Sequence, residues 1–301
     1  MGGTVSARGK GLRPSNPSRT HHRLGAAMHP AIGAALKAGP IGQGGPKAFR
    51  GPVTNQRGTS KCHAHSRAQV LWTAYGAAGI PLPFFPSPDC IATCTYADDR
   101  AIATPFGADL PPLRDVGAEL QSSSDATNRW GVAPIGWPGS APTDLSNFTD
   151  SPDGTAFAGS DGQLPILAEP NVDELHLASS RLAMPEYQLA GSGSSLVSLV
   201  VASLDVNVPL QCGGPVGPAY ESLGATAVAM PEPNGDGHAQ DVDYYRPMTD
   251  AEREQCGSTG KFVFEVCGSW GLVFANRGIA LVSEEWIEAN WNYFPGVVRP
   301  S

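Results

Sequence analysis

The order of the predicted elements is the feature that most constrains this chain, because helical patterns come first and strand patterns come later. The firmest helix follows Ser60, which we expect to cap it, since apolar residues recur at spacings of four and three over residues 64–78. Further helices are predicted within residues 88–100, 112–131 and 194–205. Runs typical of strands follow at 206–214, 237–245, 260–270 and 277–286. This order predicts an α+β protein with two lobes, the first mainly helical and the second mainly strands.

The first 46 residues differ in composition from the rest and predict a basic N-terminal arm rich in glycine and proline, with a short helix at 28–39. Eleven lysines and arginines precede Asp89, the first acidic residue, whereas residues 89–301 carry all 28 acidic residues and only nine bases. A basic arm on an acidic body can bind that body, a neighbouring subunit or nucleic acid, or can be a flexible solubilising tail. We expect a protein assembly, and not nucleic acid, to be its partner.

Several classes of protein are excluded by what the sequence lacks. No apolar run approaches the roughly 20 residues needed to span a bilayer, since the longest covers only residues 196–204. The N-terminus carries basic residues but no apolar core of a secretory signal. We therefore expect a protein of the cytoplasm or of a particle such as a virion.

The six cysteines are too few and too scattered for a disulfide scaffold, so we expect mostly free thiols. Cys90 and Cys94 lie four residues apart and lack a second close pair, which makes a zinc site from them the less favoured interpretation. No metal and no cofactor is expected.

The stretch "NQRGTSKCHAHSRA", residues 55–68, places Gln56 six residues before Cys62, at the start of the firmest helix. The helix dipole and the N-terminal amides favour the thiolate of a cysteine at such a position. Thiol catalysis also needs an imidazole and an oxyanion hole, and the backbone N–H of Cys62 with the side-chain amide of Gln56 can form that hole. The alternative is a buried structural thiol.

Six segments carry a family pattern in the same order along the chain. "GPVTNQRGTSKCHAHSRA" resembles the stretch GPVxxQGxCGSCWAFSA of the papain-like cysteine peptidases, which implies that Cys62 is the nucleophile and Gln56 the oxyanion-hole residue. "GDGHAQDVDYY" resembles GGHAVxxVGY, which implies that His238 is the catalytic histidine. "GKFVFEVCGSWGLVFANRGIALVSEEW" resembles FxVxNSWGxxWGxxGYxxV, in which Trp270 matches the tryptophan that shields the ion pair. The other three segments are "PSPDCIATC", "LRDVGAELQSSSDATNRWGVAP" and "CGGPVGPAYESL".

The resemblance covers about residues 48–295, and "CGGPVGPAYESL" is similar to the bacterial and viral branch of the family. It implies a papain-like domain over residues 47–301, with a helical lobe over about 47–165, a strand-rich lobe over about 166–301 and an active cleft between them.

The chain also departs from the family at several positions. The asparagine that orients the catalytic histidine is replaced by Gly268, which we expect to have no functional side-chain role. His63 and His65 stand where aromatic residues follow the nucleophile, and a metal site from Cys62, His63 and His238 is not favoured because it would block the thiolate. Thr59 replaces the cysteine that Cys94 would pair with in the family.

The strand after His238 is unusually polar, since it carries Gln240, Asp241 and Asp243. Alternation along a strand puts Asp241 and Asp243 on the face opposite to His238, and puts Gln240 on the same face about 7 Å away. None of the three is a convincing substitute for the missing asparagine.

These patterns predict a cysteine peptidase that hydrolyses peptide bonds of a polypeptide substrate by thiolate attack, and the loss of the asparagine is expected to attenuate its activity. The alternative is an architectural component of a particle, such as a phage tail or virion protein, that keeps the fold with little or no catalysis.

Overall fold

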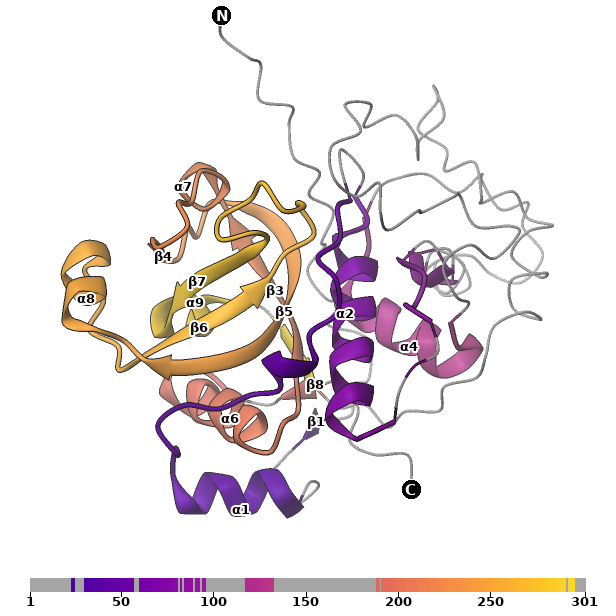
Figure 1. Ribbon diagram of the computed structural model, residues 1–301, viewed down its shortest axis with the longest axis horizontal. Helices are drawn as coiled ribbons and strands as arrows, with labels where there is room; N and C mark the ends of the chain where they lie inside the picture. The colour runs from indigo at the N-terminus through magenta and orange to yellow at the C-terminus, as the bar shows by residue number, and fades with distance from the viewer. Residues whose placement is uncertain are drawn as a thin grey trace, which may run out of the picture.

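The computed structural model describes residues 23–24, 30–56, 60–80, 82, 84–88, 90–92, 94–95, 117–132, 188–189, 191–290 and 292–295. It combines helices with a six-stranded sheet, in an α+β arrangement (Figure 1). Residues 133–170, whose content of Pro, Gly, Ser and Asp predicts a long surface connection, lie outside these residues, as does part of the predicted helix at 88–100. No helix among the described residues is long and apolar enough to cross a membrane.

The helix predicted after Ser60 is α2 (Cys62–Ala77), which lies between the sheet and α4 (Leu120–Trp130) (Figure 1). The expectation that Ser60 caps it is wrong. The helix begins one residue later, because the carbonyl of Lys61 accepts from the backbone N–H groups of Ala64 and His65 at 3.0 and 3.1 Å.

Burial of α2 extends around the whole helix and not only along the predicted apolar face. Every residue from Cys62 to Leu71 is buried, including the polar His63, His65, Arg67 and Gln69. Their polar groups are partly satisfied by neighbouring elements: Arg67 donates to the Thr127 hydroxyl on α4 at 3.0 Å, and the Ser66 hydroxyl donates to the carbonyl of Gln240 in the sheet at 2.7 Å. The first turn of α2 is therefore fixed in the interior of the molecule.

The main sheet has the strand order β4-β7-β6-β5-β3-β8, in which all neighbours are antiparallel except β4 and β7. Its strands are β3 (Leu210–Val216), β4 (Val228–Ala229), β5 (Asp236–Pro247), β6 (Phe262–Cys267), β7 (Ile279–Ser283) and β8 (Asn292–Pro295). The four predicted strand regions thus overlap β3, β5, β6 and β7, and those at 260–270 and 277–286 contain β6 and β7 entirely. The last one extends too far, because the Ser283 hydroxyl caps a helix, α9 (Glu284–Ala289), that takes up its end.

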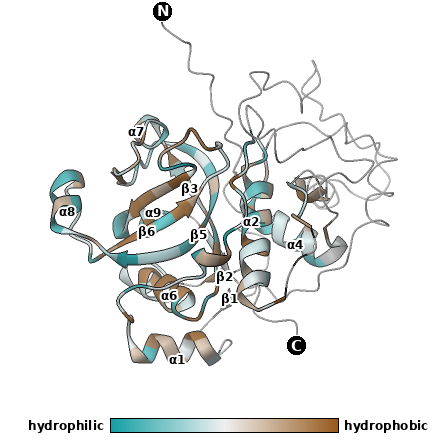
Figure 2. Cartoon of the chain, viewed as in Figure 1, coloured by the Kyte–Doolittle hydropathy of each residue, from teal (hydrophilic) through white to brown (hydrophobic). Residues whose placement is uncertain are grey.

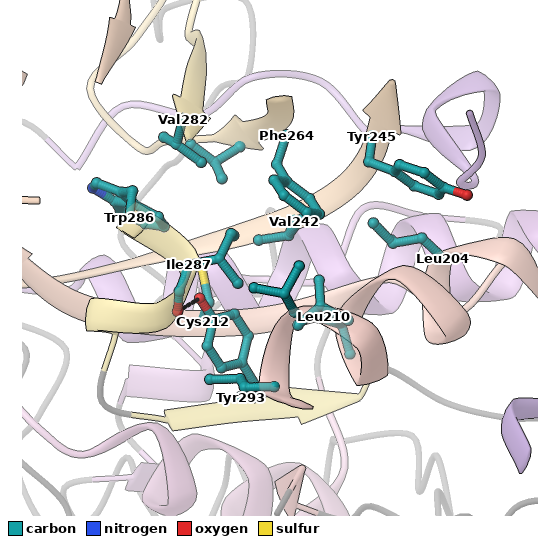
Figure 3. Close-up of a cluster of buried hydrophobic side chains, with 14 of the residues drawn as sticks. Leu204, Leu210, Cys212, Val242, Tyr245, Phe264, Val282, Trp286, Ile287 and Tyr293 are labelled. Carbon is teal, nitrogen blue, oxygen red and sulfur yellow. Dashed lines mark hydrogen bonds between the residues drawn. The ribbon is translucent and has the colours of Figure 1, made fainter. Parts of the chain in front are cut away.

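One face of the sheet packs against α6 (Ser194–Asp205) and α9, and Figure 3 shows the side chains that meet there. In this core the Tyr293 hydroxyl donates to the carbonyl of Ile287 at 2.8 Å. Apolar residues predominate on α6, whereas α8 (Asp250–Cys256) is largely hydrophilic (Figure 2). The remaining described elements are β1 (Arg23–Leu24), α1 (Pro30–Ala38), η1 (Lys47–Phe49), β2 (Gln188–Leu189) and α7 (Pro218–Glu221).

Helix α1 lies in the segment expected to be an arm, and it packs against α6. Its Ile32 is fully buried and belongs to the same apolar cluster as the sheet residues. A cavity of about 400 Å³ lies between α1 and α6, and none of the residues that line it belongs to the predicted catalytic set.

Candidate active site

Cys62 is the first residue of α2, and its side chain is fully buried. It packs in a small cluster with Leu120 of α4 and Ala239 of β5. Ala239 directly follows His238, so the thiol and the histidine belong to elements that are in contact. A cysteine at this position has the N-terminal amides of α2 beneath it, and these favour the thiolate.

His238 lies near the start of β5, where it pairs with Gly214 of β3. Its ring stacks on the indole of Trp270, with 4.2 Å between ring centroids and 22° between planes. Both side chains are almost completely buried. This stacking fixes the plane of the imidazole and covers one of its faces with an apolar ring.

Gln56 is held against the segment that contains Trp270 by two hydrogen bonds. Its backbone N–H donates to the carbonyl of Ser269 at 2.7 Å, and the Ser269 hydroxyl donates to its side-chain oxygen. Asn55 also pairs with Trp270, and Gly271 donates to the carbonyl of Thr54 at 3.0 Å. Because the oxygen of the Gln56 amide is directed to Ser269, its NH₂ group points the other way.

Ser269 was missed by the sequence prediction, although it lies within the quoted "GSW". The place of Ser269 in that motif was the sequence signal that could have identified it. Only the folded chain brings Ser269 to Gln56, which is 213 residues away.

Gly268 begins the segment that follows β6, and its backbone N–H donates to the carbonyl of Gly278 at 3.0 Å. Its φ lies outside the left-handed region, so the backbone here does not require glycine. A Cβ at this position would lie 3.6 Å from the ring of Phe274, an ordinary van der Waals contact. The position therefore has room for the start of a side chain.

Gln240 accepts a hydrogen bond from the hydroxyl of Tyr220 through its side-chain oxygen. Tyr220 in turn packs edge-on against Trp270, with 5.9 Å between ring centroids. Gln240 thus lies on the Trp270 side of β5 and contributes to the support of the indole. We assign it a structural contact here and no role as an acceptor from His238.

Asp243 binds a cation instead of approaching His238. Arg50 donates two hydrogen bonds to its carboxylate and a third to Glu265 at 2.8 Å, and Lys47 donates to Glu265 at 3.0 Å. Burial by itself would lower the pKa of Arg50, but the hydrogen bonds and the charge of the Asp243 carboxylate outweigh it and raise this pKa above its usual range. This ion-pair cluster fixes the segment leading to Gln56 onto β5 and β6.

Asp241 is fully buried and pairs with Cys267 of β6 in the sheet. Burial, and then the charge of Asp243, raise the pKa of Asp241 well above its usual range. The buried carboxyl is therefore favoured in its neutral form, which does not suit it to stabilise an imidazolium.

His63 and His65 are both buried on α2. The carbonyl of His63 accepts from the side chain of Gln211 on β3 at 2.8 Å. Burial, with the nearby charge of Lys61, lowers the pKa of His65 to about 3, so this imidazole is neutral at ordinary pH.

No group of three potential metal ligands forms among the described residues, and no disulfide joins any of the six cysteines. The described residues therefore add no third ligand to the pair of Cys90 and Cys94, whereas a structural zinc site needs four. The pKa of Cys94 is raised mainly by a hydrogen bond with Cys90 and to a lesser extent by burial.

Three features together define the fold. A buried helix starts with a cysteine, a strand that carries a histidine contacts this helix, and a tryptophan stacks on the histidine. This is the papain-like cysteine protease fold. Solved structures agree with it. Xylellain, a cysteine protease from Xylella fastidiosa, superposes with a TM-score of 0.68 at 18% identity, over 99% of this chain and 100% of that one.

Two further structures have the same fold. Procathepsin B from Trypanosoma congolense matches with a TM-score of 0.61 at 14% identity, over 97% of this chain and 87% of that one. The cysteine protease and lectin-like domains of Cwp84, a surface layer associated protein of Clostridium difficile, match with a TM-score of 0.63 at 13% identity. This match covers 99% of this chain and 58% of that one. No family model and no curated protein matches the sequence.

Proposed function

We propose that this protein is a cysteine peptidase that cleaves peptide bonds of polypeptides, with Cys62 as the nucleophile and His238 as the acid and base. The observation that carries the proposal is the packing of Cys62 against Ala239, the residue next to His238. The ring of His238 stacks on Trp270, and the residue before Trp270 holds Gln56. Three segments that are distant in the sequence, around residues 56–62, 238 and 270, thus supply an amide donor and a thiol, an imidazole, and a shield.

In the proposed acylation, the Cys62 thiolate attacks the carbonyl carbon of the substrate and a C–S bond forms. The oxyanion accepts hydrogen bonds from the Cys62 backbone N–H and the Gln56 side-chain amide. His238 then gives its proton to the nitrogen of the leaving amine as the C–N bond breaks. A thioester remains on Cys62.

In the proposed deacylation, His238 takes a proton from water, and the oxygen of that water attacks the thioester carbonyl. The C–S bond breaks, the carboxylic acid product leaves, and the thiolate with its imidazolium is restored. Burial of Trp270 against His238 keeps bulk water from this ion pair.

The deciding experiment is the pH dependence of alkylation at Cys62. Of the six cysteines, only Cys256 is not buried, so Cys256→Ser removes the most accessible competing thiol. Because Cys62 is buried, the reagent must be small, such as iodoacetamide, and the modified residue is identified by peptide mapping. Selective labelling of Cys62 at about pH 5–6, abolished in Cys62→Ala, supports a catalytic thiolate.

Labelling that rises only toward about pH 8–9 would favour the architectural alternative, because it would show an ordinary thiol. Peptide hydrolysis provides the second measurement. His238→Ala should reduce kcat by about a thousandfold or more if the imidazole is the acid and base.

A further inference from the structure

The cavity between α1 and α6 has no part in the proposed peptidase mechanism, yet it has the size of a binding site. Its volume is about 400 Å³. Sites for small molecules usually have volumes of roughly 300–1,000 Å³, whereas packed protein interiors contain few voids larger than a water molecule. The two helices pack on each other below the sheet in the view of Figure 1. The cavity is therefore a candidate ligand site that the N-terminal segment forms together with the body of the protein.

The lining of the cavity is mainly apolar and comes from α1, α6 and the start of β6. Its apolar side chains include Ala35, Leu36, Val197, Val201, Ala202 and Phe262. Burial against such a surface removes apolar area from water, so the lining favours a ligand with an apolar body.

Asp205, the last residue of α6, is the polar group that gives this cavity a chemical preference. Its Oδ1 accepts a hydrogen bond from the hydroxyl of Tyr245, whereas its Oδ2 is buried and accepts none from the described residues. Burial, and then the hydrogen bond to Asp205, raise the pKa of Tyr245 above its usual range, so this hydroxyl stays a donor. Buried polar atoms are normally hydrogen-bonded, so the second carboxylate oxygen requires an explanation.

Neither the helix nor the contact with Tyr245 explains why residue 205 is an aspartate. A negative charge is unfavourable at the C-terminal end of a helix, because the helix dipole is negative there. The Tyr245 hydroxyl needs only one acceptor, and the neutral amide oxygen of an asparagine would provide it. The carboxylate is explained if a further donor, supplied by a ligand, meets Oδ2.

The other charged residues of the lining are Lys261 and Glu284. One oxygen of Glu284 accepts hydrogen bonds from the backbone N–H groups of Lys261 and Phe262, both at 2.7 Å. Two carboxylates and one ammonium group leave the lining with a net negative charge. This charge favours a cationic ligand over an anionic one.

We propose that the cavity between α1 and α6 binds a small molecule that has an apolar body and a protonated amine, and that this amine donates to Oδ2 of Asp205. The proposal goes beyond the proposed peptidase function and does not depend on it. The ligand contacts α1 on one side and α6 on the other.

The test measures the affinity of the full-length chain for three probes of similar size at pH 7. They are 2-phenylethylamine, 2-phenylethanol and 3-phenylpropanoate, which share a phenyl ring and differ in the head group. Ligand-observed NMR titration should show the amine binding most tightly and the carboxylate most weakly. Asp205→Asn keeps an acceptor for Tyr245 but removes the charge, and it should raise the Kd of the amine by about tenfold.

Ser198→Phe is the second variant, because Ser198 lies on the exposed side of α6 and lines the cavity. The added ring fills the cavity without changing a core residue, and it should abolish binding of the amine. Ser195→Phe is the matched control, since Ser195 is an exposed serine of the same helix that does not line the cavity. It should leave the Kd unchanged.

Three results would each overturn the proposal. They are no binding of the amine to the wild type, tighter binding of the carboxylate than of the amine, and an unchanged Kd of the amine in Asp205→Asn or Ser198→Phe. None of these measurements involves cleavage of a peptide, so the outcome is separate from that of the proposed function.

Discussion

Gly268 occupies the position at which the resembling family has the asparagine that orients the catalytic histidine. Because its φ is ordinary and a Cβ would meet the Phe274 ring at 3.6 Å, we expect Gly268→Asn to fold. An amide accepting from His238 should raise kcat/KM on a peptide substrate about tenfold, which corresponds to ~1.4 kcal/mol. Gly268→Ala is the matched control, since it makes the same backbone change without the amide. Equal effects of the two variants would contradict a restored hydrogen bond.

His65 makes a second prediction at the scale of the residue. Burial and Lys61 lower its pKa to about 3, whereas the unfolded chain has the ordinary value of about 6.5. Between these pH values the unfolded state binds more protons, so the stability that neutral His65 provides is present above about pH 6.5 and is lost as pH falls toward 3. His65→Gln removes this titration.

Urea unfolding of wild type and His65→Gln between pH 7 and 5 measures the effect. The wild type should lose up to about 1.4 kcal/mol more per pH unit below the unfolded pKa than the variant does. Parallel pH profiles would show that His65 does not titrate differently in the folded state.

At the scale of the element, α8 shows how a short helix is fixed by its own sequence. The Thr249 hydroxyl accepts from the backbone of Glu252, and the Glu252 carboxylate accepts from the backbone of Thr249 at 2.9 Å. Arg246 adds two hydrogen bonds to the same carboxylate at 2.6 and 2.9 Å. These contacts lower the pKa of Glu252 to about 2, and the hydrogen bonds from Arg246 contribute most.

Glu252→Gln should therefore lower the free energy of unfolding by about 0.5–1 kcal/mol at pH 7, a modest value because the pair is partly exposed. Because the pKa of Glu252 is lower in the folded chain than in the unfolded chain, its carboxylate stabilises the fold at pH values above about 4.3, the pKa in the unfolded chain. This contribution is lost as pH falls toward 2. Denaturant unfolding at pH 7 and pH 2.5 should show the difference between wild type and variant shrinking. Glu254→Gln, an exposed glutamate of the same helix, should have little effect at either pH.

At the scale of the whole molecule, Gln211 connects the sheet to the two helices beside it. Its amide donates to the carbonyl of His63 on α2 at 2.8 Å and to the Ser123 hydroxyl on α4 at 3.1 Å. Gln211→Leu would remove the amide that donates to both groups and leave the buried His63 carbonyl and Ser123 hydroxyl without this donor. The substitution should lower the free energy of unfolding by about 1–3 kcal/mol. Urea unfolding measures this cost.

A double-mutant cycle of Gln211→Leu with Ser123→Ala tests the coupling between the two lobes, which we expect to be at least about 0.5 kcal/mol. Ser198→Ala on α6, which removes an exposed hydroxyl bonded within its own helix, is the control. Additive effects of the two substitutions would argue against a shared network.

The sequence by itself determined the types and order of the longer elements, because helix and strand periodicities depend on residues that are near one another in the chain; the short helices α7, α8 and α9 were not predicted. Helix α6 matches its predicted range of 194–205, and β5 contains the predicted strand at 237–245. The family resemblance added the fold, which the solved structures support. The roles of Cys62, Gln56, His238 and Trp270 remain predictions.

Only the tertiary structure decided the contacts between distant segments. The burial of α2 on all sides from Cys62 to Leu71, with His63 and Arg67 inside, follows from α4 and the sheet covering faces that the local pattern predicted to be polar. The pairing of Arg50 with Asp243, across 193 residues, likewise has no local signal in either segment. The physical reason is that an ion pair or a buried amide is fixed by the packing of whole elements, whereas periodicity records only which side of one element turns inward.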